Sequence, residues 1–115
     1  MSEYVFLYRN AVENSRPNWS SPEKAQQNMK KWRAWFEELG QKGCLKAIGQ
    51  PLEEGGKVVN AKRAVTDGPY AETKDLIGGY SLIEAANLDE AARLAQGCPI
   101  LENGGMVEVR PVMQM

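Results

Sequence analysis

Two segments of the chain are apolar on both faces of an expected strand, and this feature most constrains the fold. Side chains alternate between the faces of a strand, and in YVFLYR, residues 4–9, aromatic residues alternate with valine and leucine. In LIGGYSLIE, residues 76–84, Tyr80 and Leu82 are expected on one face and Ile77 and Ile83 on the other. Such strands belong at the centre of a sheet, because both of their faces need cover.

A long helix is predicted after the first strand. The run SSPEK offers Ser20 or Ser21 as the N-cap and places Pro22 in the first turn. Gly40 and Gly43 are expected to end the helix. The residues expected on its buried side recur at helical spacing: Ala25, Met29, Trp32, Trp35, Phe36 and Leu39, with Arg33 among the charged residues of the solvent side.

The remaining elements are three strands and a second helix. Residues 44–50 and 57–66 have the pattern of strands joined across PLEEGG, and Asn60 is a point where the second strand could divide. Asn87 and Glu90 form a capping box at the start of a short helix, and MVEVRP, residues 106–111, forms the last strand. The buried side of the short helix is expected to consist of Leu88, Ala91, Ala92, Leu94 and Ala95.

This order of elements is the split βαβ or ferredoxin-like pattern, an α+β fold with an antiparallel sheet. A length of 115 residues corresponds to one domain, residues 1–115. Two helices cover one face of such a sheet and leave the other face exposed, which is unfavourable where that face is apolar. A second copy packed sheet to sheet would cover it and enclose a cavity, so we expect a homodimer.

The charge balance and the cysteines exclude several classes of function. With 14 Lys plus Arg against 15 Asp plus Glu, the chain lacks the basic surface of a nucleic-acid or membrane-surface binder. Neither a signal segment nor a run of ~20 apolar residues is present, so we expect a cytoplasmic protein without membrane contact. Cys44 and Cys98 are expected to be small buried apolar residues and not a disulfide.

The sequence contains no histidine, which removes Ser-His-Asp and Cys-His nucleophile systems and zinc sites built on imidazole. Acid–base chemistry would depend on Asp, Glu, Lys, Tyr or Cys side chains with shifted pKa values. We expect no metal and no cofactor.

The segment VTDGPYAETKD, residues 65–75, is the candidate site. Asp67, Gly68 and Pro69 are suited to a tight corner, and Tyr70 to an anchor against the core. Gly78 and Gly79 would allow a bulge or a close approach of the backbone to a ligand.

Two interpretations of this segment remain open. In the structural one, Asp67 satisfies its own turn, while Glu72 and Lys74 are solvated or pair with charges of a partner subunit. In the functional one, Asp67 or Glu72 is an acid–base or ligand-orienting carboxylate, and Lys74 contacts an anion. The further ligand-binding candidates are Thr73, Tyr80, Arg63 and Arg110. Packing is the expected role of Trp19, Trp32 and Trp35.

The runs VTDGPYAETKDLIGGYSLIEA, NLDEAARLAQGCP and GMVEVRPV, in this order, resemble the YCII-related family in its DGPF-motif branch, whose pattern reads DGPFAETKE. Tyr70 stands where that pattern has Phe, and Asp75 where it has Glu. The resemblance implies a dimeric α+β barrel of ferredoxin-like protomers in bacterial cytoplasmic proteins. The wider family has been proposed to use a His–Asp pair, for which this chain has no His.

Two classes of function follow from these features. The first is binding of a small, anionic molecule in a cavity at the dimer interface, with catalysis left open. The second is a non-catalytic accessory or regulatory protein, linked through the family resemblance to extracytoplasmic-function sigma factors.

Overall fold

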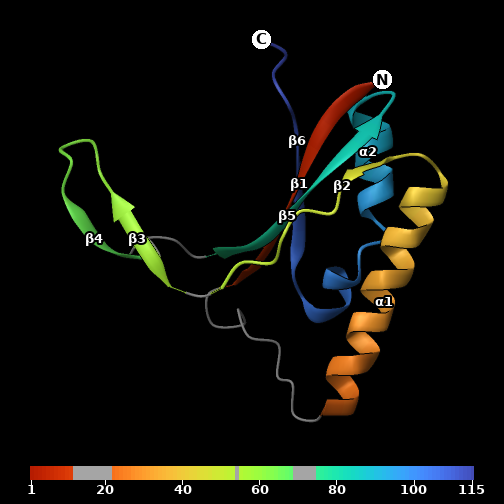
Figure 1. The fold of residues 1–115 in the computed structure, drawn as a ribbon, viewed down its shortest axis with the longest axis horizontal. Coiled ribbons are helices and arrows are strands. Elements are labelled where there is room, and N and C mark those ends of the chain that lie inside the picture. The colour runs from red at the N-terminus through yellow and green to blue at the C-terminus, as the bar shows by residue number, and fades with distance from the viewer. Residues whose placement is uncertain (12–21, 54, 69–74) are drawn as a thin grey trace.

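The computed structural model describes residues 1–11, 22–53, 55–68 and 75–115, and its centre is a four-stranded antiparallel sheet. The strand order is β2 (Leu45–Ala47), β5 (Asp75–Ala85), β1 (Ser2–Ala11) and β6 (Met106–Pro111) (Figure 1). β1 lies between β5 and β6, and β5 lies between β1 and β2. The prediction that both doubly apolar segments form central strands is therefore confirmed.

Two helices lie on one side of this sheet, α1 (Pro22–Gln41) and α2 (Leu88–Ala95) (Figure 1). A 3₁₀ helix, η2 (Pro99–Asn103), follows α2 and leads into β6. The order β1, α1, β2, β5, α2, β6 together with this sheet order makes an α+β fold consistent with the ferredoxin-like pattern. The sequence did not reveal η2, because Gly97 and Pro99 are signals that end a helix and give no sign of a further helical turn.

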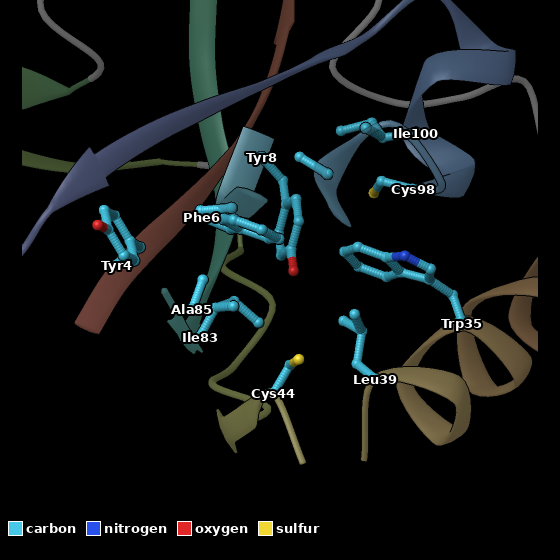
Figure 2. Close-up of a cluster of buried hydrophobic side chains, with 12 residues drawn as sticks. Tyr4, Phe6, Tyr8, Trp35, Leu39, Cys44, Ile83, Ala85, Cys98 and Ile100 are labelled. Atoms are coloured by element: carbon cyan, nitrogen blue, oxygen red, sulfur yellow. The ribbon is translucent and has the colours of Figure 1, made fainter. Parts of the chain in front are cut away.

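The hydrophobic core lies between the sheet and the helices. Phe6 is fully buried on β1, and Trp35 of α1 lies over it with the two ring centroids 6.1 Å apart and nearly parallel. Figure 2 shows Trp35 and Leu39 of α1 facing the side chains of the sheet. Cys44 and Cys98 are buried free cysteines at the edge of this cluster, as expected from the sequence.

The opposite face of the sheet carries apolar side chains that no described helix covers. Val5 pairs with Leu82 and Leu7 pairs with Tyr80 on this face. The prediction placed Ile77 on the face opposite to Tyr80, and this is wrong. A bulge shifts the register between Tyr8 and Arg9, so that Arg9 pairs with Ile77 and the isoleucine joins the same face.

Charged pairs border this open face, which we define by Val5, Leu7, Ile77, Tyr80 and Leu82. Arg9 forms an ion pair with Glu108 at 2.7 Å, and Lys46 forms one with Glu3. The expectation of an apolar face without helical cover is confirmed for the described residues.

A separate two-stranded sheet, β3 (Gly56–Val59) and β4 (Val65–Gly68), projects from the body (Figure 1). The side chain of Asn60 accepts hydrogen bonds from the backbone nitrogens of Lys62 and Ala64, at 2.9 and 3.0 Å, and so builds the turn. The expected division at Asn60 is confirmed. The two strands that PLEEGG joins do not pair with each other, because residues 50–52 hydrogen-bond to β5 through Tyr80 and Gly78, and β3 pairs with β4.

The first helix departs from its predicted burial pattern at Met29. The candidate caps Ser20 and Ser21 lie outside the described residues, and the helix runs to Gln41 before Gly43 adopts a φ of 72°. Trp35 and Leu39 are its buried residues, whereas Met29 is 53% exposed. The reason is that Met29 borders a pocket and does not pack against the sheet.

The second helix begins as predicted and buries fewer residues than predicted. The Glu90 nitrogen donates to Asn87 Oδ1 at 2.8 Å, and Glu90 Oε2 accepts from the Ala86 nitrogen at 3.3 Å. Ala91 and Ala95 are buried, but Leu88 is 46% exposed and Ala92 is exposed as well. These two alanines, one turn apart, form the contact between α2 and the sheet. Because their side chains are small, the short helix lies close to the sheet.

Candidate functional site

A pocket of about 330 Å³ lies between α1 and the segment 48–51 that follows β2. Residues of α1 at helical spacing form one wall: Met29, Trp32, Arg33 and Phe36. Segment 48–51 forms the opposite wall, and Tyr8, Gly79 and Tyr80 of the sheet complete the lining. The pocket is therefore built from α1, segment 48–51 and the strands β1 and β5.

Aromatic rings pack against one another in the α1 wall. Trp32 meets Tyr8 edge to face, with ring centroids 5.0 Å apart and planes at 85°, and lies 5.8 Å from the ring of Phe36. Such geometry is favoured by the charge distribution of aromatic rings. Trp32 and Phe36 are only partly buried, in contrast to Trp35 at 5% exposure. Trp35 thus belongs to the core, whereas Trp32 is shared between the core and the pocket.

Close backbone contacts hold the opposite wall against β5. Gly49 has a φ of 74°, and a Cβ at this position would lie 1.9 Å from the carbonyl oxygen of Tyr80. At Gly79 a Cβ would lie 3.1 Å from the carbonyl oxygen of Gln50. Glycine is needed at position 49 for both its backbone angle and its contact. The wall is therefore fixed in place by its packing on β5.

A buried hydrogen-bond chain attaches the same wall to the sheet. The hydroxyl of Tyr8 donates to Ser81 Oγ at 2.7 Å, and Ser81 Oγ donates to the carbonyl oxygen of Ile48 at 2.6 Å. Burial raises the pKa of the Tyr8 phenol well above its usual value. The phenol therefore stays protonated at neutral pH and keeps its role as a donor.

The sequence-predicted site residues do not come together in the described structure. Tyr80 belongs to the open face and also borders the pocket at the edge of the sheet, beside Gly49. Asp67 lies on β4, where its side chain is 87% exposed and its carboxylate lies 2.5 Å from Lys57 Nζ. Arg63 lies at the turn of the same hairpin with a φ of 66°, and Arg110 lies on β6 with its Nε 3.9 Å from Glu108 Oε2.

The remaining candidates are in or beside the segment between β4 and β5. Glu72, Thr73, Lys74, Pro69 and Tyr70 lie outside the described residues. Gly68 ends β4 opposite Gly56. Gly78 and Gly79 lie at the bulge of β5, where Leu52 N donates to the carbonyl oxygen of Gly78 at 2.8 Å.

Sequence reasoning missed the pocket, although it identified part of one wall. Trp32 and Phe36 were expected on the buried stripe of the helix, and Arg33 on its solvent side. The sequence signal that could have revealed the other wall is the glycine in IGQP, because Gly49 allows the chain to turn back against β5. That signal is weak, since glycine and proline are frequent in loops of every kind.

Neither an activated cysteine nor a metal cluster is found among the described residues. Burial raises the pKa of the Cys98 thiol to about 12, so this side chain is protonated and a poor nucleophile at neutral pH. Within the described ranges, no group of three or more His, Cys, Asp or Glu side chains could hold a metal ion. None of the helices described is both long and apolar enough to cross a membrane.

The fold and the pocket define a small α+β protein with an apolar cavity between a helix and the edge of its sheet. The model of the YCII-related domain matches residues 4–115, and the chain belongs to this family.

A curated relative and a solved structure add to this assignment. An uncharacterized protein of Rhizobium meliloti (strain 1021) is 46% identical over 52 residues, which cover 42% of this chain and 40% of the relative. The match thus spans about two fifths of the relative's length.

The solved structure is that of 5-chloro-2-hydroxyhydroquinone dehydrochlorinase from Burkholderia phenoliruptrix AC1100 in complex with 2,5-dihydroxybenzoquinone. It is 20% identical, with a TM-score of 0.50, and the alignment covers 98% of this chain and 95% of the other. At this identity the likeness concerns the fold alone.

Proposed function

We propose that the chain, as a single domain of residues 1–115, binds a small molecule with a planar apolar group in the pocket between α1 and segment 48–51. The observation that carries this proposal is the partly exposed aromatic wall of Trp32 and Phe36 beside a cavity of about 330 Å³. Ligand pockets commonly measure ~300–1,000 Å³ and are lined mainly by apolar and aromatic side chains. A molecule of one or two rings suits this volume.

The solved structure of the dehydrochlorinase supports the proposal at the level of the fold. That protein is in complex with a dihydroxybenzoquinone, a planar ring, on a fold similar to this one. Catalysis is left open for this chain. The proposed ligand site lies on the helical side of the sheet and not in the intersubunit cavity expected from the sequence.

We also propose that the chain forms a cytoplasmic homodimer of the DGPF branch, assembled through the open face as a dimeric α+β barrel. Leu7 and Val5 on that face are half-buried in the single chain, and Tyr80 and Ile77 are 38% and 41% exposed. A second copy would remove these side chains from water.

The second candidate function is an accessory or regulatory interaction, favoured by the projecting β3–β4 hairpin. Val59 and Val65 on this hairpin are 64% and 62% exposed. Exposed valines on a projecting ribbon suit contact with another protein, which the family resemblance would identify as a component of sigma-factor regulation.

The experiment for the first function is a calorimetric titration with 2-naphthol, a neutral two-ring compound. We expect saturable binding by the parent protein and its loss in Ile48→Trp, because Ile48 lines the pocket and is 55% exposed, so the larger ring can fill the cavity without strain in the core. Leu101→Trp is the matched control, since Leu101 is 43% exposed on η2 and does not line this pocket. If both variants bind 2-naphthol with equal affinity, the compound binds outside this pocket.

A further inference from the structure

We propose that the ligands of this pocket are planar aromatic monoanions, and that the guanidinium of Arg33 binds the anionic group at the edge of the cavity. This inference rests on the proposed function, because it names the chemical class of ligand for the same pocket.

The first argument is the charge of the lining. Among the described residues that line the pocket, Arg33 is the one with a formal charge at neutral pH, and no carboxylate lies beside it in that lining. The other lining side chains are apolar, aromatic or uncharged amides. Because the one formal charge of this lining is positive, the lining favours an anionic ligand over a cationic one.

The second argument is that Arg33 has no partner in the described chain. Other basic side chains are paired: Lys31 with Glu102 at 3.0 Å, and Lys42 with Glu38 at 3.0 Å. No hydrogen bond or ion pair joins Arg33 to another described residue, although Glu37 lies one helical turn away. Its donors are therefore available for a bound molecule.

The third argument is the position of Arg33 on α1. It directly follows Trp32 and lies three residues before Phe36, so it borders the cavity beside the aromatic wall. Arginine can lay its aliphatic stem along apolar surface and keep its guanidinium in water. A ring can thus enter the apolar cavity while its charged group stays at the hydrated edge, where desolvation costs least.

The chemistry of the guanidinium favours a carboxylate on the ring. Arginine presents planar, parallel N–H donors that match the two oxygens of a carboxylate, and hydrogen bonds of this charged kind are stronger than neutral ones. One guanidinium neutralises one negative charge, so a monoanion fits better than a dianion such as a phosphate ester.

The test compares 2-naphthoate with 2-naphthamide, which has the same rings and no charge, by calorimetric titration of the full chain at pH 7.5 and low salt. We expect the parent to bind 2-naphthoate about tenfold more tightly than the amide. Arg33→Gln should abolish this preference and leave the affinity for the amide unchanged. Lys30→Gln is the matched control, because it removes a positive charge from the same helix at an exposed position that does not line the pocket.

The outcomes separate this inference from the proposed function. Equal affinity of the parent for acid and amide overturns the anion preference and leaves the aromatic pocket in place. Binding of neither compound overturns the proposed function, and this inference with it. An equal loss of preference in Arg33→Gln and Lys30→Gln shows a general charge effect and overturns the contact with Arg33. Unchanged thermal midpoints establish that both variants are folded.

Discussion

At the scale of single residues, Ser81 links the core to the wall of the pocket. It is a fully buried polar side chain of β5, and its hydroxyl accepts from Tyr8 and donates to the carbonyl oxygen of Ile48. A buried hydroxyl is tolerated only where its hydrogen bonds are made. Ser81 therefore stabilises the fold and fixes the position of Ile48 at the same time.

Replacing this serine should destabilise the protein. Ser81→Ala leaves the buried Tyr8 hydroxyl without its acceptor, and we expect the free energy of unfolding in urea to fall by about 1–3 kcal/mol. Tyr8→Phe should lower it by only about 0.5–1.5 kcal/mol, because Ser81 keeps its bond to Ile48. If Tyr8→Phe proves the more harmful change, the chain of hydrogen bonds is not what Ser81 contributes.

At the scale of elements, the pocket depends on a turn that only glycine can make. Segment 48–51 leaves β2, passes Gly49 at a positive φ and lies against β5, where Pro51 forms a bridge to Gly79. Each of these contacts joins parts of the chain about thirty residues apart, so none is visible as a local pattern.

Gly49→Ala and Gly43→Ala form a matched pair, because the φ angles are 74° and 72°. A Cβ at Gly43 meets nothing within 4 Å, whereas at Gly49 it lies 1.9 Å from the carbonyl oxygen of Tyr80. We expect Gly43→Ala to cost about 1–2 kcal/mol for the backbone angle alone. Gly49→Ala should cost clearly more and should weaken binding of 2-naphthol. Equal thermal midpoints for the two variants would contradict the close contact.

The sequence predicted the elements whose signals are local. Aromatic alternation revealed β1 and β5, the capping box of Asn87 revealed α2, and the last strand was predicted at its observed bounds. Burial on the helices was predicted less well, since Met29 faces the pocket and Leu88 faces solvent. The pattern of a helix shows which residues share a side, but not how far the sheet extends beneath them.

Of the residues named for the candidate site, Gly79 and Tyr80 line the described pocket. Asp67, Arg63 and Arg110 are polar residues of the kind that bind ligands, yet the first two lie on the β3–β4 hairpin and Arg110 lies on β6. Their convergence depends on the placement of a hairpin that pairs with itself and not with the main sheet. Composition carries no information about such a placement.

At the scale of the whole molecule, the sheet has one face packed against helices and one face that is apolar without helical cover. Val5, Leu7 and Leu82 lie in the middle of the open face, and charged pairs such as Arg9–Glu108 lie toward its border. An apolar centre with a polar rim is the arrangement of protein–protein interfaces.

We expect light scattering at micromolar concentration to give about twice the 12.8 kDa mass of the chain. Leu7→Glu, which places a charge in the centre of the open face, should convert this species to a monomer. Leu101→Glu is the control, because Leu101 is an exposed leucine on η2, away from that face. A parent protein that remains monomeric, or a control that dissociates as well, argues against the sheet-to-sheet dimer.

The central position of β1 also affects when the sheet can form during synthesis of the chain. Its two neighbours, β5 and β6, begin 64 and 95 residues after β1 ends at Ala11. A ribosome therefore releases this doubly apolar strand long before either partner exists, and loop closure over such separations slows folding. Until β6 emerges, one edge of β1 is unprotected and can pair with another nascent chain. The order in which the chain is made therefore leaves one edge of this strand open until the end of the sequence is synthesised.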